Sequence, residues 1–162
     1  MSSEKFVHDK FVNDVFSYID KTRFAVLAYV RHDGTPLLRS IGSFVPNGLS
    51  LYFTTRKDAA KVKEISDRKR ISFFFEHEGQ ELSAWKNLLL VGDAVKIDSG
   101  SDFDDAVQLL SARNPRFKDR VAKGELPSTQ IFRLNTEEIE FLDYGKGIGH
   151  VEKVTLKKAE SL

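Results

Sequence analysis

Hydroxyl and cationic side chains are concentrated in one short stretch, LYFTTRKDAAKVKEI at residues 51 to 65. The stretch begins with the pattern of a strand and ends with that of a helix. Two hydroxyl and two cationic residues stand at the junction: Thr54, Thr55, Arg56 and Lys57. The N–H groups that begin a helix form the positive end of its dipole and attract anions. With Lys61 in the first helical turn, the stretch could bind a phosphate through charge-assisted hydrogen bonds.

Asp58 allows a second interpretation of the same stretch. It stands where a helix cap is expected, and its carboxylate can accept hydrogen bonds from the first N–H groups of the helix. It would then compete with a phosphate for these donors. The alternative to an anion site is therefore a capped surface helix with solvated lysines, and the stretch alone leaves both interpretations open.

Arg39 is a charged residue inside an apolar strand pattern, PLLRSIGSFV at residues 36 to 45. If this strand pairs with the strand that contains Thr54, the two residues are neighbours across the sheet and Arg39 joins the anion site. The alternative is that Arg39 points to solvent from the polar face of its strand.

Other chemistry has little support in the sequence. The four histidines, at positions 8, 32, 77 and 150, lack the spacing of metal ligands, so no metal site is predicted. The absence of cysteine excludes a disulfide, a thiolate nucleophile and a cysteine-ligated metal. The glycines of residues 145 to 149 are not followed by a helical pattern and so do not form a dinucleotide fingerprint. They predict a flexible turn or an active-site loop.

The elements that must position these residues are mainly strands. Strand patterns occupy residues 23–30, 36–45, 49–55, 70–77, 85–97, 129–135 and 137–144. Helical patterns occupy residues 4–21, 59–66, 101–112 and 116–123. Asp33-Gly34 is a strong hairpin signal, and Gly92 indicates a bend or a close approach. Tight turns between about seven strands predict a mainly β fold, an antiparallel β-barrel with α-helices at its N-terminus and periphery.

Length and charge narrow the class of protein. The 162 residues suit a single domain, predicted over residues 1–150, with a polar C-terminal tail over residues 151–162. A net charge of +1 gives no general attraction to nucleic acid or to a membrane surface. No apolar run approaches the ~20 residues of a membrane helix, and no signal peptide is recognisable. We expect a cytoplasmic protein.

Four segments, in this order and spacing, resemble a known family: VRHDGTPLLRSI, YFTTRKDAAKVKEI, WKNLLLVGDAV and IFRLNTEEIEFLDYGKGIGH. Over residues 22 to 150 the chain is similar to the FMN-binding split β-barrel proteins related to pyridoxamine 5'-phosphate oxidase. The resemblance implies a split β-barrel that binds flavin mononucleotide (FMN) at the interface of a homodimer.

The resemblance also implies which residues contact the flavin. Arg39 takes the place of a cofactor-binding arginine, with backbone contacts from Ser40 and Ile41. Lys61 takes the place of the lysine that holds the phosphate, and Asn87 that of a glutamine beside the ring. The full implied set is Arg39, Ser40, Ile41, Thr54, Thr55, Arg56, Lys57, Lys61 and Asn87. Thr55, Arg56 or Lys57 is included because Ala59-Ala60 replaces the Ser-Arg pair of the oxidases.

The function implied is that of an FMN-dependent oxidoreductase of unknown substrate. No residue is identified as a catalytic acid or base. A non-enzymatic flavin-binding protein, for storage or sensing, is a second interpretation, and a relative that binds haem or a deazaflavin is a third. The closing segment GKGIGHVEKVTLKKAESL lacks the Arg- and Trp-rich end of the true oxidases. We therefore expect a substrate other than pyridoxamine 5'-phosphate.

Overall fold

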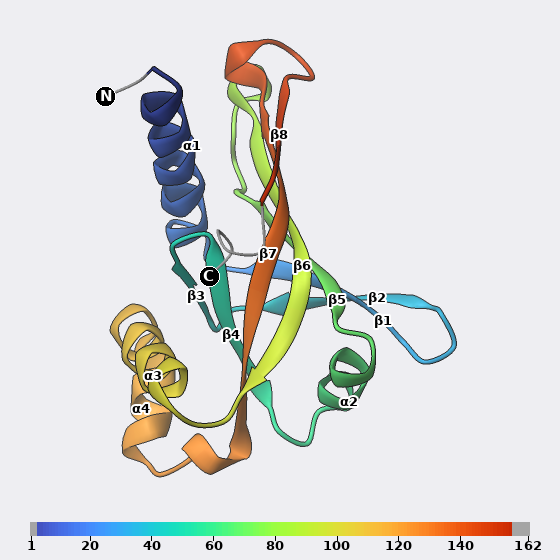
Figure 1. Ribbon diagram of the computed structural model, residues 1–162, viewed down its shortest axis with the longest axis vertical. Coiled ribbons are helices and arrows are strands. Elements are labelled where there is room, and N and C mark those ends of the chain that lie inside the picture. The colour runs from blue at the N-terminus through green and yellow to red at the C-terminus, as the bar shows by residue number, and fades with distance from the viewer. Residues whose placement is uncertain (1–2, 157–162) are drawn as a thin grey trace.

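The computed structural model describes the backbone of residues 3 to 156 and the side chains of residues 8 to 156. Eight strands form one curled sheet: β1 Ala25–Val30, β2 Pro36–Ile41, β3 Phe44–Asn47, β4 Ser50–Arg56, β5 Arg70–Glu76, β6 Lys86–Ile97, β7 Thr129–Asp143 and β8 Val151–Thr155 (Figure 1). The order is β2-β1-β5-β6-β7-β4-β3, with β8 beside β7. Four α-helices surround the sheet: α1 Ser3–Asp20, α2 Ala60–Asp67, α3 Ser101–Arg113 and α4 Pro115–Ala122. The predicted mainly β, antiparallel split-barrel class is confirmed.

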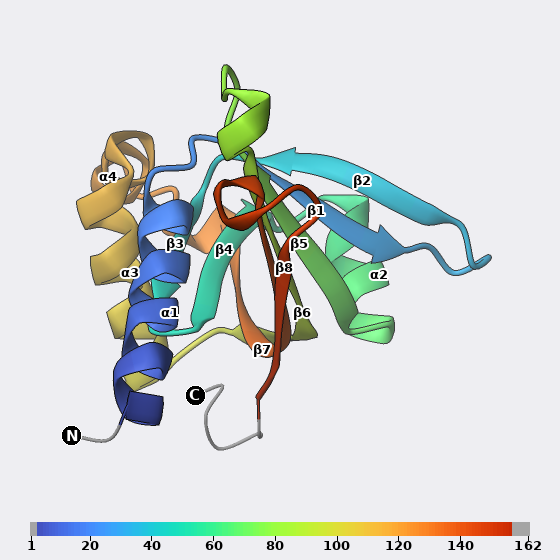
Figure 2. The same ribbon diagram turned by 90° about the horizontal axis from the view of Figure 1, so that it is seen from above.

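The elements pack around two apolar clusters. Figure 2 shows α3 and α4 together on one side of the sheet and α2 on the opposite side. The barrel core is rich in stacked and edge-to-face rings, and α1 and α2 pack against it. The second cluster lies between the sheet and the α3–α4 pair. Successive side chains of β4 point to opposite faces of the sheet, so this strand contributes to both clusters: Phe53 belongs to the first and Tyr52 to the second.

The segment 36–45 forms two strands rather than the single strand expected. It breaks at Gly42 and Ser43, so that β2 pairs with β1 while β3 pairs with β4. At this corner the Thr54 N–H donates to the Ser43 carbonyl at 3.0 Å. Arg39 lies opposite Leu27, and the expectation that Arg39 and Thr54 are cross-strand neighbours is wrong. The strand patterns do not reveal the break because the residues on both sides of Gly42 are apolar strand formers.

Residues 129–143 form one long strand where two were expected. The pairing of β7 with β6 shifts its register between Val91 and Gly92, where Gly92 lies opposite Thr136. A Cβ atom at Gly92 would lie 2.0 Å from the carbonyl oxygen of Asn135. The close approach predicted for Gly92 is confirmed, and this bulge lets a single strand continue past the irregularity.

Replacement of Gly92 by alanine is expected to destabilise the fold by about 2 kcal/mol, because the added methyl group overlaps backbone that cannot move freely. For a chain of this size the thermal midpoint should fall by roughly 4–8 °C. Differential scanning calorimetry measures the effect. An unchanged midpoint would show that the β6–β7 bulge relaxes without cost.

The C-terminal residues contribute more to the sheet than expected. Residues 151–155, placed in a polar tail by their composition, form β8 along β7, and Leu156 is buried. The remainder of the predicted tail lies outside the described residues. Among residues 3–156, no helix is long and apolar enough to cross a membrane.

Candidate functional site

Two cationic side chains converge where α2 meets the β1–β2 hairpin. Arg39 lies directly opposite Leu27, and residues opposite one another in an antiparallel pair share a face. Leu27 belongs to the barrel core, as do Val62 and Ile65 of α2. Partial burial lowers the pKa of Lys61 below the ordinary lysine value, and the positive charge of Arg39 lowers it further. Lys61 and Arg39 are therefore close enough to repel each other.

No carboxylate neutralises this pair among the described side chains. Arg39 donates one hydrogen bond, to the Leu38 carbonyl at 2.7 Å, and Lys61 has no ion-pair partner. The next lysine on α2, Lys63, does pair with a carboxylate, that of Asp67 at 3.6 Å. Lys61 is partly buried and Arg39 is exposed, and a partly buried cation beside a like charge is costly without a counter-charge. An anion bound between Arg39 and Lys61 would remove this cost.

Asp58 does not cap α2, so the prediction of a capping carboxylate is wrong. The residue at the cap position is Ala59, which makes no side-chain cap hydrogen bond. The Asp58 carboxylate instead pairs with Arg56 at 2.9 Å, and both side chains are exposed. The first N–H groups of a helix lack partners within the helix. Because the Asp58 carboxylate does not accept from them, it does not compete with an anion for these donors.

The two threonines at the end of β4 point in different directions. The Thr54 hydroxyl donates to the Ser43 Oγ at 2.6 Å, on the face of the sheet that also carries Tyr52. Thr55 alternates with Thr54 and so lies on the face of Phe53 and the barrel core, the face to which Arg39 also belongs. Thr55, rather than Thr54, is therefore the hydroxyl that shares a face with the cation pair.

The other residues of the predicted set are distributed over both faces. Ser40 is exposed opposite Val26, on the outer face of the sheet, whereas Ile41 is buried. Asn87 also lies on the outer face, at the start of β6, and its amide donates to the Glu76 carboxylate at 3.1 Å. Lys57 is exposed, and its backbone N–H donates to the Ser128 carbonyl at 2.9 Å. Within one chain, Asn87 and Lys61 are therefore on opposite sides of the sheet.

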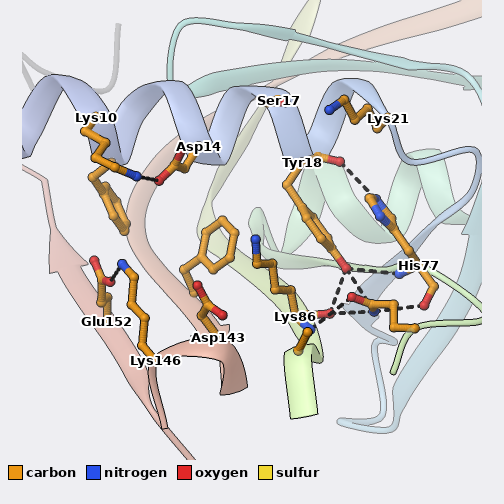
Figure 3. Close-up of a pocket in the computed structure, with 14 residues that line it drawn as sticks. Lys10, Asp14, Ser17, Tyr18, Lys21, His77, Lys86, Asp143, Lys146 and Glu152 are labelled. Carbon is orange, nitrogen blue, oxygen red and sulfur yellow. Dashed lines mark hydrogen bonds and ion pairs between the residues drawn. The ribbon is translucent and has the colours of Figure 1, made fainter. Parts of the chain in front are cut away.

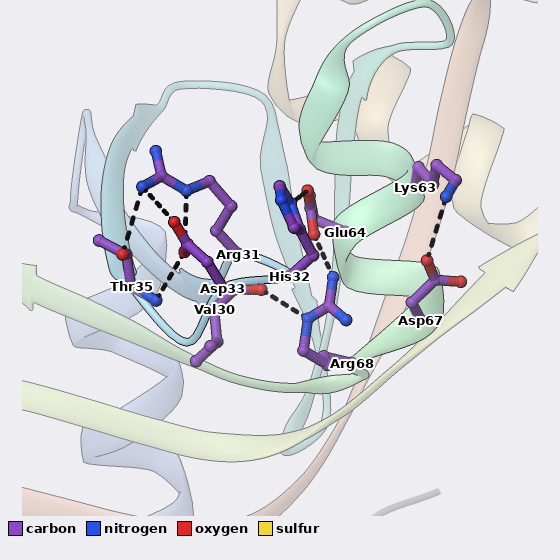
Figure 4. A network of polar contacts seen from close by, with 9 residues as sticks. All are labelled: Val30, Arg31, His32, Asp33, Thr35, Lys63, Glu64, Asp67 and Arg68. Atoms are coloured by element: carbon purple, nitrogen blue, oxygen red, sulfur yellow. Dashed lines mark hydrogen bonds and ion pairs between the residues drawn. The ribbon is translucent and has the colours of Figure 1, made fainter.

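A polar network holds the β1–β2 hairpin against α2 (Figure 4). Arg68, at the end of α2, donates to the Val30 carbonyl at 3.1 Å and pairs with Glu64. The other Glu64 oxygen lies 3.1 Å from His32 Nδ1 in the hairpin turn. The contact with His32, and then that with Arg68, holds the pKa of Glu64 below its usual range. This network fixes β2 relative to α2 and so positions Arg39 relative to Lys61.

The roles of His32, Glu64 and Arg68 in this network were not predicted from the sequence. The only available signal was the four-residue spacing of Glu64 and Arg68 on one helix face. The turn itself is fixed by Asp33, which accepts two hydrogen bonds from Arg31, at 3.0 and 2.8 Å. These bonds, with one from Thr35, hold the pKa of Asp33 far below its usual range. Among the described residues, no group of three or more potential ligands could hold a metal ion.

Comparison with solved structures identifies the same fold in several bacterial proteins. A haem-binding protein from Mycobacterium smegmatis matches with a TM-score of 0.75 and 14% identity, over 93% of this chain and 59% of that one. A conserved hypothetical protein from Mycobacterium tuberculosis matches with a TM-score of 0.71 and 16% identity, over 98% and 94%. A Listeria innocua protein, provisionally a pyridoxamine 5'-phosphate oxidase, matches with a TM-score of 0.61 and 18% identity, over 82% and 98%.

At these identities the structural matches show the fold alone. The chain spans 59% of the length of the haem-binding protein. Comparison with curated protein sequences gives no significant match. The family model of pyridoxamine 5'-phosphate oxidase, however, matches residues 12–143, which include the barrel strands β1 to β7 and the cation pair. The chain therefore belongs to the pyridoxamine 5'-phosphate oxidase family.

Proposed function

We propose that the protein binds FMN and acts as an FMN-dependent oxidoreductase. The observation that carries this proposal is a pair of adjacent, unneutralised cations, Arg39 of β2 and Lys61 in the first turn of α2. A terminal phosphate dianion suits this pair because it can accept charge-assisted hydrogen bonds from both. The Thr55 hydroxyl and the first N–H groups of α2 add neutral donors. The donor set thus fits a mononucleotide phosphate.

We further infer that two copies of the chain complete each flavin site. The outer face of the sheet carries a row of apolar side chains that the described residues leave partly uncovered: Val26, Ala28, Leu38, Phe74, Leu89 and Val91. The side chain of Leu38 is 63% exposed. A second copy placed on this face would bury it. Asn87 of one protomer could then reach a flavin ring whose phosphate is held by Arg39 and Lys61 of the other protomer.

This arrangement gives the flavin and the protein different roles. The flavin, when bound, supplies the hydride or electron transfer, and the protein binds, orients and shields it. Arg39 and Lys61 would hold the phosphate, the backbone of Ser40 and Ile41 would lie along the ring, and Asn87 would contribute an amide. A storage or sensing role uses the same residues. Steady-state turnover of the bound flavin with an added electron donor distinguishes the two roles.

A haem-binding role is the second candidate, and the structural match to the Mycobacterium smegmatis haem-binding protein favours it. Three of the four histidines favour FMN instead, because each of them has a protein partner, whereas His8 is exposed on α1. His32 lies against Glu64, His77 stacks on Tyr18 and His150 lies 3.5 Å from Glu152. Haem ligation by one of these three would require it to give up its contact.

The identity of the cofactor can be tested on the purified protein. The absorption spectrum distinguishes a flavin from a haem, and mass spectrometry of the ligand released on denaturation identifies it. We expect FMN, either co-purified or retained after it is added. Recovery of haem, or failure to retain added FMN, would contradict the proposal.

The affinity for FMN should depend on the ionisation of Lys61. The phosphate favours the charged ammonium, so binding weakens as the pH rises through the pKa of Lys61 in the free protein. This pKa lies below the ordinary 10.5. In Arg39→Ala the pKa of Lys61 rises, and the transition should move to higher pH. Fluorescence titration across this range measures both effects.

Riboflavin provides the control, because it has the same ring and no phosphate. Any loss of binding that comes from ionisation of the ring itself affects riboflavin and FMN alike, whereas the contribution of Lys61 affects only FMN. If FMN affinity still falls over the same pH range in Lys61→Gln, the pH dependence belongs to another group.

A further inference from the structure

A cavity lies between α1 and the end of the sheet where β6, β7 and β8 meet (Figure 3). We call it the α1 pocket, and the residues that matter for its chemistry are Phe11, Tyr18, Gln80, Lys86 and Phe141. Its volume is about 450 Å³, which lies within the range of small-molecule sites, about 300–1,000 Å³. It shares no lining residue with the Arg39–Lys61 site.

Three aromatic rings form one wall of the α1 pocket. Phe141 meets Tyr18 edge to face with ring centroids 5.6 Å apart, and it meets Phe11 in the same way at 6.5 Å. His77 stacks on the Tyr18 ring at 3.9 Å with an interplanar angle of 4°. The Tyr18 ring is therefore held in place, and the wall offers fixed apolar contacts to a planar ligand.

The backbone of Lys86 is held beside the aromatic wall by hydrogen bonds to Tyr18 and Gln80. Its carbonyl oxygen accepts hydrogen bonds from the Tyr18 hydroxyl at 2.7 Å and from Gln80 Nε2 at 2.8 Å. Its N–H donates to Gln80 Oε1 at 3.0 Å. Figure 3 shows the Lys86 side chain extending from the start of β6 toward α1. These contacts fix the backbone of Lys86 and do not involve its ammonium group.

The charges in the α1 pocket are unequally matched. Lys10 pairs with Asp14 at 2.9 Å, and Lys146 pairs with Glu152 at 2.5 Å. Among the described residues, no carboxylate lies within 4.0 Å of the Lys86 ammonium. Asp143, its direct partner in the β6–β7 register, accepts a hydrogen bond from the Gly145 N–H at 2.9 Å instead. Lys21 also lines the pocket without an ion-pair partner among the described residues, but it is exposed. The half-buried Lys86 is therefore the less solvated of the two unpaired cations.

We propose that the α1 pocket binds a small aromatic anion, with its ring against Phe11, Tyr18 and Phe141 and its acidic group on Lys86. The cavity volume suits a molecule with one or two rings. The acidic group can be a carboxylate or a phosphate, since an ammonium binds either as a point charge. This site is separate from the flavin site and does not depend on FMN binding.

Phenyl phosphate and benzoate are suitable probes for the full-length protein in the presence of FMN. Amide chemical shifts in a ¹⁵N-labelled sample report which residues respond to each probe. We expect saturable shifts at Tyr18, Gln80, Lys86 and Phe141 with either probe. Benzyl alcohol, which lacks the charge, and inorganic phosphate, which lacks the ring, should each bind at least about tenfold more weakly.

Variants at two lysines of the same pocket make the test specific. Lys86→Gln should weaken both probes about tenfold or more, whereas Lys86→Arg keeps the charge and should retain binding. Lys10→Gln is the matched control, because it removes the same charge from a lysine that is already paired, and it should change binding less than about twofold. Equal losses in Lys86→Gln and Lys10→Gln, or no shifts at the pocket residues, would overturn the proposal.

Discussion

Lys61→Ala and Arg39→Ala are each expected to weaken FMN binding about tenfold or more. A hydrogen bond to a charged group contributes ~1.5–3 kcal/mol, and 1.4 kcal/mol corresponds to a factor of about ten in the dissociation constant. Each single variant keeps one of the two cations that contact the phosphate, so the double variant should lose more affinity than either single one. Flavin fluorescence titration gives the three dissociation constants.

Lys63→Ala is the matched control for these variants. Lys63 lies on α2 two residues from Lys61, its side chain is 85% exposed, and it pairs with Asp67. Its removal should leave FMN affinity within about twofold. If Lys61→Ala and Arg39→Ala bind FMN as tightly as the unchanged protein, the phosphate lies elsewhere.

Leu38→Glu should convert a dimer into a monomer and release the flavin. The side chain stands on the apolar outer face of the sheet, and a carboxylate buried there without a partner costs several kcal/mol. Light scattering should report about twice 18.4 kDa for the unchanged protein and about 18.4 kDa for the variant. Flavin retention should fall together with dimerisation, because Asn87 of one protomer would no longer meet the site of the other.

Phe16→Glu separates this effect from a general loss of apolar surface. Phe16 is 41% exposed and belongs to α1, away from the outer face. This variant should remain dimeric and should retain FMN. A flavin-loaded monomer of the unchanged protein at micromolar concentration would contradict the two-copy site.

Features that local geometry determines could be predicted from the sequence. Asp33-Gly34 closes the β1–β2 hairpin, with the Arg31 N–H donating to the Thr35 carbonyl at 2.9 Å. Gly92 marks the close approach of β6 to β7. The position of Lys61 in the first helical turn follows from the strand-to-helix pattern around it. Each of these features depends on neighbouring residues or on a single steric requirement.

Features that depend on long-range pairing could not be predicted. The break at Gly42 separates two equally apolar strands, and only the choice of β1 and β4 as partners reveals it. β8 has the composition of a tail and becomes a strand because β7 offers it a free edge.

The candidate sites also depend on contacts between residues far apart in the sequence. The proximity of Arg39 to Lys61 depends on the contact of the β1–β2 hairpin with α2, through His32 and Glu64, which are 32 residues apart. The α1 pocket joins Tyr18 to Lys86 across 68 residues. No spacing rule along the chain connects residues so distant, so the resemblance could suggest the first site and nothing suggested the second.

The central claim is that Arg39 and Lys61 form a phosphate site for FMN, and comparison of FMN with riboflavin by calorimetric titration tests it most directly. The two ligands share the ring and differ in the phosphate. We expect FMN to bind the unchanged protein at least about tenfold more tightly than riboflavin, with most of this preference lost in Lys61→Ala. Equal affinities for the two ligands would contradict the claim.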